Sequence, residues 1–224
     1  GHRLGLWSWQ TGFSILRWAA YLGIAVAAVA LIATLVSLAA RAWRWLLASL
    51  VALALGAGTF AVPALQLQQA QNAPPIHDIT TDIEDPPGYV ALLERRASAS
   101  NPPVYGGEPV AAQQRRAYPE IGPISYRLPP DQVFERVLQV VRDMGLEVVA
   151  AEPGSGRIEA VATSFWFGFK DDVVIRIRRD GAGSVIDIRS SSREGIGDLG
   201  VNAARIKEFT RRVIEGSRPA EGGG

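Results

Sequence analysis

The sequence predicts an α+β membrane protein, in which an N-terminal transmembrane helical hairpin precedes a two-layer domain built on an antiparallel sheet. Three observations predict this class. Residues 1–65 contain no acidic residue and only four arginines. The rest of the chain holds 19 basic and 22 acidic residues, a net charge of −3, which is typical of a soluble domain. From residue 124 onward, segments with strand alternation are combined with two helical patterns.

Two uncharged apolar runs, residues 18–40 and 45–67, form the predicted hairpin. A helix of about 20 apolar residues spans the hydrocarbon core of a bilayer. Only four residues separate the runs, so the two helices must be antiparallel neighbours. Neither run has a polar face, which argues against two core helices of a soluble protein. Residues 1–17 are expected to lie along the membrane surface. The residues predicted at the membrane interface are Trp7, Trp9, Trp18, Trp43 and Trp45.

The charges beside the spans predict the orientation in a bacterial cytoplasmic membrane. The short turn carries Arg41 and Arg44, and basic residues near a span are retained in the cytoplasm. Residues 66–93 contain no Lys or Arg but four acidic residues. This pattern predicts a multi-pass protein with its C-terminal domain in the periplasm. An N-terminus on that side needs a signal peptide or an earlier span, so a further upstream helix is expected.

The soluble part is predicted to consist of three segments. Residues 68–117 are rich in Pro, Ala, Gln and Gly without a sustained period, and are expected to form an extended connector. Residues 118–216 are expected to form the α+β domain outside the cytoplasm. Residues 217–224, with the sequence SRPAEGGG, are expected to be a flexible tail.

Within the domain, the predicted element order is β-α-β-β-β-β-α. A short strand over 124–128 precedes a helix that Pro129-Pro130-Asp131 opens and Gly145 ends. Four strands are expected over 146–151, 157–165, 172–178 and 184–190, and a last helix over 198–214. Alternation sends Ile175, Ile177, Ile186 and Ile188 toward the two helices that cover one face. On the other face, Arg176, Arg178, Asp187 and Glu159 are expected to form a solvated cross-strand network.

The densest polar motif is SSSREGIGDLGVNAAR, where a glycine-rich loop enters a helix. Free backbone N–H groups and the helix dipole favour an anion there. An anion-binding loop would use Arg193, Gly195, Asn202 and Arg205. In the alternative, Asp198 caps the helix and occupies those N–H groups itself, while Asn202 and Arg205 secure the loop against the sheet.

Four aromatic residues crowd the motif SFWFGFKDD, and strand alternation cannot bury all of them on one face. Some are therefore expected to be exposed as an interaction surface for the membrane, a ligand or a partner. The alternative is that the connector covers them. These residues are Phe165, Trp166, Phe167 and Phe169.

Catalytic motifs are scarce in this sequence. The stretch IHDITTDIEDPP places His77 among acidic residues, but its spacing matches neither an EF-hand loop nor HExxH, so turn and capping roles are favoured over a metal site. No cofactor fingerprint is present. The acidic balance of the domain argues against nucleic acid as a partner. The absence of cysteine excludes disulfides and thiolate chemistry.

Four phrases, PPIHDITTDIEDPP, AYPEIGPI, SFWFGFKDDVVIRIR and SSSREGIGDLGVNAARIKEF, resemble an uncharacterised family of bacterial and plastid proteins, domain of unknown function number 1499. The resemblance covers about residues 75–214. It implies a membrane-anchored architecture, often with a further upstream span, and no established activity.

Together these patterns predict a non-enzymatic accessory protein of the cytoplasmic membrane. Its partners would be the lipid bilayer and another membrane or periplasmic protein, within a larger complex. A module that binds a lipid or small hydrophobic ligand is the alternative, and a hydrolase or metalloenzyme built on His77 is a third class.

Overall fold

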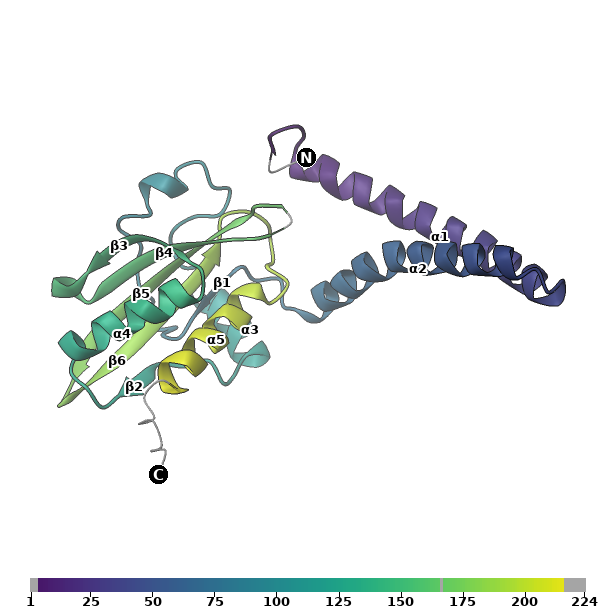
Figure 1. The fold of residues 1–224 in the computed structure, drawn as a ribbon. Helices are drawn as coiled ribbons and strands as arrows, with labels where there is room; N and C mark the ends of the chain where they lie inside the picture. Colours follow the sequence, from purple (N-terminus) through teal and green to yellow (C-terminus); the bar gives the residue numbers. More distant parts are fainter. Residues whose placement is uncertain (1–3, 166, 216–224) are drawn as a thin grey trace, which may run out of the picture. The chain divides into compact units, whose positions relative to one another are not determined.

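The computed structural model describes residues 4–165 and 167–215. The chain divides into two compact units, Gly1–Asn72 and Ala73–Gly224. Each unit is described by itself below (Figure 1). The predicted tail, residues 217–224, lies outside the described residues.

The first unit is the predicted helical hairpin, formed by α1 (Trp9–Ala39) and α2 (Trp43–Asn72). Both helices contain stretches long and apolar enough to cross a membrane, which suggests membrane anchoring. Helix α1 begins where the Ser8 hydroxyl accepts a hydrogen bond from the Thr11 amide. Residues 9–17, expected as a separate interfacial segment, are therefore the first turns of α1. Helix α2 likewise continues five residues beyond the predicted span end at Leu67.

Small residues set the distance between the two helices. A Cβ added to Gly56 would lie 2.8 Å from the Gly23 carbonyl oxygen, so only glycine fits at this crossing. One hydroxyl hydrogen bond joins the helices, from Thr34 Oγ1 to Ser49 Oγ at 3.0 Å. Close backbone approach through small residues and hydroxyl bridges is the usual packing mode of helices in lipid.

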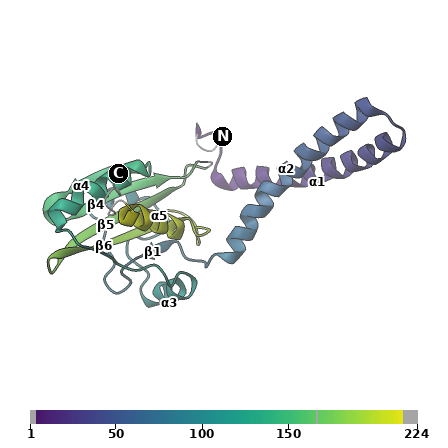
Figure 2. The same cartoon turned by 60° about the horizontal axis from the view of Figure 1, so that its bottom comes forward.

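The second unit contains a six-stranded sheet with the order β1-β6-β5-β4-β3, in which β2 also pairs with β6. All of these pairings are antiparallel. Helices α4 and α5 cover one face (Figures 1 and 2). The predicted fold class and the order of elements from residue 118 onward are thus confirmed. The bounds are β1 Asp78–Thr80, β2 Ile124–Tyr126, α4 Pro130–Asp143, β3 Glu147–Glu152, β4 Arg157–Thr163, β5 Lys170–Asp180, β6 Gly183–Ser192 and α5 Val201–Glu215.

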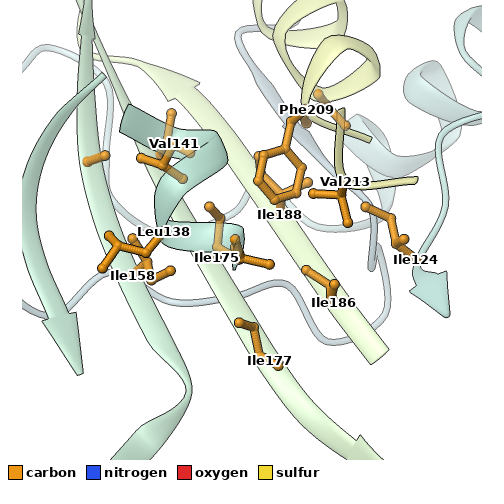
Figure 3. Close-up of a cluster of buried hydrophobic side chains, with 14 of the residues drawn as sticks. Ile124, Leu138, Val141, Ile158, Ile175, Ile177, Ile186, Ile188, Phe209 and Val213 are labelled. Carbon is orange, nitrogen blue, oxygen red and sulfur yellow. The ribbon is translucent and has the colours of Figure 1, made fainter. Parts of the chain in front are cut away.

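The main core lies between the sheet and these two helices. The predicted inward isoleucines of β5 and β6 are buried there against Leu138 and Val141 of α4 and Phe209 and Val213 of α5 (Figure 3). Alternation along the strands therefore identified the helix-covered face correctly.

Residues 68–117 are not an extended connector throughout. They include the end of α2, strand β1, a 3₁₀ turn at Glu94–Arg96 and helix α3 (Glu108–Ala117). Tyr89 and Leu92 pack against Val161 and Val174, which point away from α4 and α5. We call residues 81–105 the covering segment, because they lie over the second face of the sheet.

The outer edge of β1 is closed by a side chain. The Gln114 amide of α3 accepts a hydrogen bond from the Thr80 N–H at 3.0 Å and donates one to the Thr80 carbonyl at 2.6 Å. Both groups of Gln114 thus bond as the backbone of a further strand would.

Candidate functional site

The second face of the sheet carries a buried charge cluster centred on Asp172 of β5. Asp172 Oδ2 lies 2.7 Å from Arg96 Nη1 of the covering segment. The guanidinium of Arg193 binds both oxygens of the same carboxylate, at 2.7 and 2.9 Å. Asp172 and Arg96 are almost completely buried. Two arginines therefore share one carboxylate, which ties the covering segment to the sheet.

Glu159 of β4 is the second buried carboxylate on this face. It accepts three backbone hydrogen bonds from the covering segment, from the N–H groups of Val90, Ala91 and Leu92 at 2.9, 3.1 and 2.9 Å. The prediction that placed Glu159 in a solvated cross-strand network is wrong, because this side chain is fully buried.

A third anchor joins Arg189 of β6 to Asp78 of β1, with hydrogen bonds of 2.9 and 2.7 Å. The guanidinium of Arg189 also lies 4.8 Å from the centre of the Tyr89 ring. Burial raises the pKa of the Tyr89 hydroxyl well above its usual range. Tyr89 is therefore a neutral hydrogen-bond donor at physiological pH, and its hydroxyl donates to the Asp172 carbonyl at 2.9 Å.

The rest of the predicted charge network does form. Asp187 Oδ2 accepts from Arg176 at 3.1 Å and from Arg178 at 2.8 Å. Asp82 and Asp85 of the covering segment form ion pairs with the same two arginines. The network is only partly solvated, because Asp187 is buried. These ion pairs hold the covering segment in place.

The side-chain donors of the predicted anion-binding loop already have acceptors within the protein. Arg193 binds Asp172, and Arg205 binds Asp171 at 2.7 Å. Asp198 accepts from the N–H groups of Gly200 and Asn202, at 2.9 and 2.7 Å. Its burial raises its pKa. The Asn202 amide donates to the His77 carbonyl, and the Gly195 carbonyl accepts from Asn101. The arrangement is that of the capping alternative.

His77 and its acidic neighbours do not converge on one point. The His77 ring lies 3.3 Å from the Ile196 carbonyl through Nδ1, while Asp78 and Asp82 are bound to arginines. Within the described ranges, no group of three potential His, Asp or Glu ligands is close enough to hold a metal ion.

The predicted aromatic surface lies in the loop between β4 and β5, residues 164–169, which we call the hairpin loop. Its ends are joined by a hydrogen bond from the Ser164 N–H to the Phe169 carbonyl. The Phe167 and Phe169 rings stack with centroids 5.6 Å apart. Phe165 is 74% exposed, whereas Trp166 lies outside the described residues.

A second apolar loop, which sequence reasoning missed, leaves β6 at the same end of the sheet. The Arg193 N–H donates to the Lys170 carbonyl, so residues 193–201 begin beside the hairpin loop. We call residues 193–201 the tether-end loop, because they lie beside Pro74 and Pro75, which follow α2 in the chain. Ile196, Leu199 and Val201 are 82%, 51% and 47% exposed. Glycines separate these aliphatic residues in the sequence, so no helical or strand periodicity marks them as a group.

A cavity of about 300 Å³ adjoins the tether-end loop. Its lining includes Ile76, His77, Val104, Val110 and Ile196. The volume is at the lower end of the range for small-molecule sites, and the lining combines aliphatic side chains with a few polar groups.

Comparison with known proteins gives a family and distant structural likenesses. Among solved structures, CalU16 from Micromonospora echinospora is 14% identical, with 41% of this chain and 73% of that chain covered and a TM-score of 0.31. TTHA0849 from Thermus thermophilus is 16% identical, with 43% and 97% covered and a TM-score of 0.27. Ara h 8.0201 is 12% identical, with 42% and 95% covered and a TM-score of 0.21. Such low TM-scores support no inference about ligand or activity.

No curated protein matches the chain. The model of the family described as "Protein of unknown function (DUF1499)" matches residues 78–213, more than half of the chain. The match begins at β1 and ends within α5, so it includes the sheet, both covering helices and the covering segment. The chain therefore belongs to this family of proteins of unknown function, as its motifs indicated.

Proposed function

We propose that the protein is a non-enzymatic accessory protein of the bacterial cytoplasmic membrane, whose second unit binds another membrane or periplasmic protein. The observation that carries this proposal is the hairpin loop. Phe165 is 74% exposed in a loop that stacked phenylalanines and a backbone hydrogen bond hold in shape. Exposed aromatic side chains on a rigid support are the usual anchors of protein interfaces.

The charged residues favour the same reading. Asp172, Glu159 and Asp78 are each engaged by arginines or backbone N–H groups. A general base or nucleophile needs a free lone pair directed at a substrate. These carboxylates instead direct their lone pairs at arginines and backbone N–H groups of the protein itself, so their role is structural.

The proposed orientation places the Arg41–Arg44 turn in the cytoplasm and the second unit in the periplasm. The chain has no cysteine, so single cysteines can report each side. In intact cells, a membrane-impermeant maleimide is expected to label Ala182→Cys, in the exposed turn between β5 and β6, and to spare Ala42→Cys between α1 and α2. Labelling of Ala42→Cys alone would reverse the proposed orientation.

A pull-down from native membranes in mild detergent tests the proposed interaction. Phe165→Ser is expected to lower recovery of the partner at least tenfold, because an aromatic anchor at an interface contributes about 2 kcal/mol or more. Leu128→Ser is the matched control, since Leu128 is 42% exposed just after β2. Equal recovery of the partner with both variants would refute the assignment of the hairpin loop.

The second candidate is a module that binds a lipid or small hydrophobic ligand, and the cavity beside Ile76 and Val110 favours it. Native mass spectrometry of the same purified sample separates the two. Recovery of the protein without a partner but with a bound lipid would support this candidate and reject the accessory protein.

A further inference from the structure

We propose that the tether-end loop rests in the interfacial layer of the bilayer, with Ile196, Leu199 and Val201 inserted among the lipids. This inference rests on the proposed membrane anchoring by α1 and α2. It does not depend on the hairpin loop or on a protein partner. It adds a second, peripheral membrane contact to the part of the chain that is otherwise outside the membrane.

The exposed side chains of this loop form a local group. A single exposed aliphatic residue is normal on a soluble surface. Here three large aliphatic residues lie within six positions, and Ile196 is 82% exposed, more than any other large apolar residue described. A concentration of this kind marks a surface that contacts a partner or a membrane.

Backbone strain supports the same conclusion. Leu199 has a φ of 58°, in the left-handed region that only Gly, Asn and Asp adopt readily. Leu199 is half exposed, so its packing within the second unit offsets little of the strain energy. Glycine already occupies the next position, Gly200, where φ is 81°. A leucine kept in this conformation is explained if its side chain has an apolar environment outside the second unit.

The loop lies beside Pro74 and Pro75, which closely follow the proposed membrane span in the chain. A Cβ added to Gly197 would lie 3.4 Å from Pro75 Cα and 3.6 Å from the Pro74 carbonyl oxygen. The candidate span of α2 ends at Leu65, and α2 itself at Asn72. Seven helical residues rise about 10 Å. Two extended residues add about 7 Å. Because this tether is short, the loop meets the bilayer at a high effective concentration. A weak affinity for lipid is then enough to keep the loop inserted.

The contact is expected to be apolar rather than electrostatic. Arg193 and Arg205 are bound to Asp172 and Asp171. Lys170 and Glu194, which flank this end of the sheet, carry opposite charges. The loop therefore has no basic cluster for anionic lipid, and insertion should occur in zwitterionic lipid with little dependence on salt.

The test uses the full chain in phosphatidylcholine nanodiscs, with an environment-sensitive fluorophore on a single cysteine. On Ile196→Cys, the probe is expected to emit at shorter wavelength and to be quenched by spin-labelled lipid rather than by aqueous iodide, at both low and high salt. On Leu128→Cys, beside the turn between β5 and β6, the probe is expected to behave in the opposite way.

Leu199→Gly, added to the Ile196→Cys protein, separates insertion from folding. It should reduce the inserted fraction about tenfold, because one large aliphatic side chain is lost from the contact. It should also raise the melting temperature of the second unit by about 2–4 °C, because the strained conformation suits glycine. A lower melting temperature would overturn the strain argument.

The remaining outcomes are distinguishable. A water-exposed probe on Ile196→Cys in nanodiscs overturns the inference but leaves the anchoring intact. A probe that is shielded only in native membranes shows that a protein partner covers the loop, which also overturns it. If the full chain purifies without detergent and does not enter nanodiscs, the proposed anchoring fails as well.

Discussion

Asp172→Asn is expected to destabilise the second unit by about 3–5 kcal/mol, the cost of leaving buried charge without its counter-ion. The substitution keeps the shape of the side chain and removes only the charge that Arg96 and Arg193 share. Arg96 cannot move to solvent easily, because its side chain is almost fully buried. This loss is a large part of the roughly 5–15 kcal/mol that stabilises a typical domain. Urea unfolding of the full chain in detergent, followed by circular dichroism, measures it.

Glu147→Gln is the matched control for this change. Glu147 also contacts an arginine at 2.7 Å, but in the pair with Arg95 the two side chains are 58% and 48% exposed. Solvent screens such a pair, so the expected cost is below about 1 kcal/mol. Equal costs for the two variants would show that burial of the Asp172 cluster contributes nothing to stability.

Glu159→Gln is expected to cost about 2–4 kcal/mol and to loosen the covering segment. A carboxylate can accept all three N–H groups of Val90, Ala91 and Leu92, whereas an amide turns its NH₂ group toward at least one of them. A buried N–H without an acceptor then remains. Hydrogen exchange should show faster exchange at residues 90–92.

The control for Glu159→Gln is Glu152→Gln, at the exposed end of the edge strand β3. It should leave exchange at residues 90–92 unchanged. Unaltered protection in both variants would mean that the Tyr89 and Leu92 contacts and the ion pair of Arg96 hold residues 90–92 on the sheet without Glu159.

The helix-covered face of the sheet could be predicted from the sequence, because apolar residues that alternate along a strand lie on its buried face. Ile175 and Ile177 alternate with Arg176 and Arg178, and the structure places the isoleucines in the core. The arginines were assigned to the opposite face correctly. The partial burial of Arg176 could not be predicted, because it depends on a segment distant in sequence that has no hydrophobic period of its own.

The contacts of the covering segment show why its position could not be predicted from the sequence. Glu159 binds backbone N–H groups, which every residue except proline carries, so no residue type in the sequence marks the partner. Strand β1 has only three residues, too few to show alternation. In the tether-end loop, aliphatic residues separated by glycines resemble ordinary turn sequence, and the strain at Leu199 is visible only in the backbone.

The Gln114 side chain at the border of β1 has a consequence for crowding. Proteins confined to a membrane meet one another more often than they would in free solution. An edge strand with unpaired N–H and C=O groups can pair with a strand of a neighbouring copy, which extends the sheet across molecules. Because the Gln114 amide already occupies both groups of Thr80, copies of this protein can accumulate in one patch of membrane without joining their sheets there.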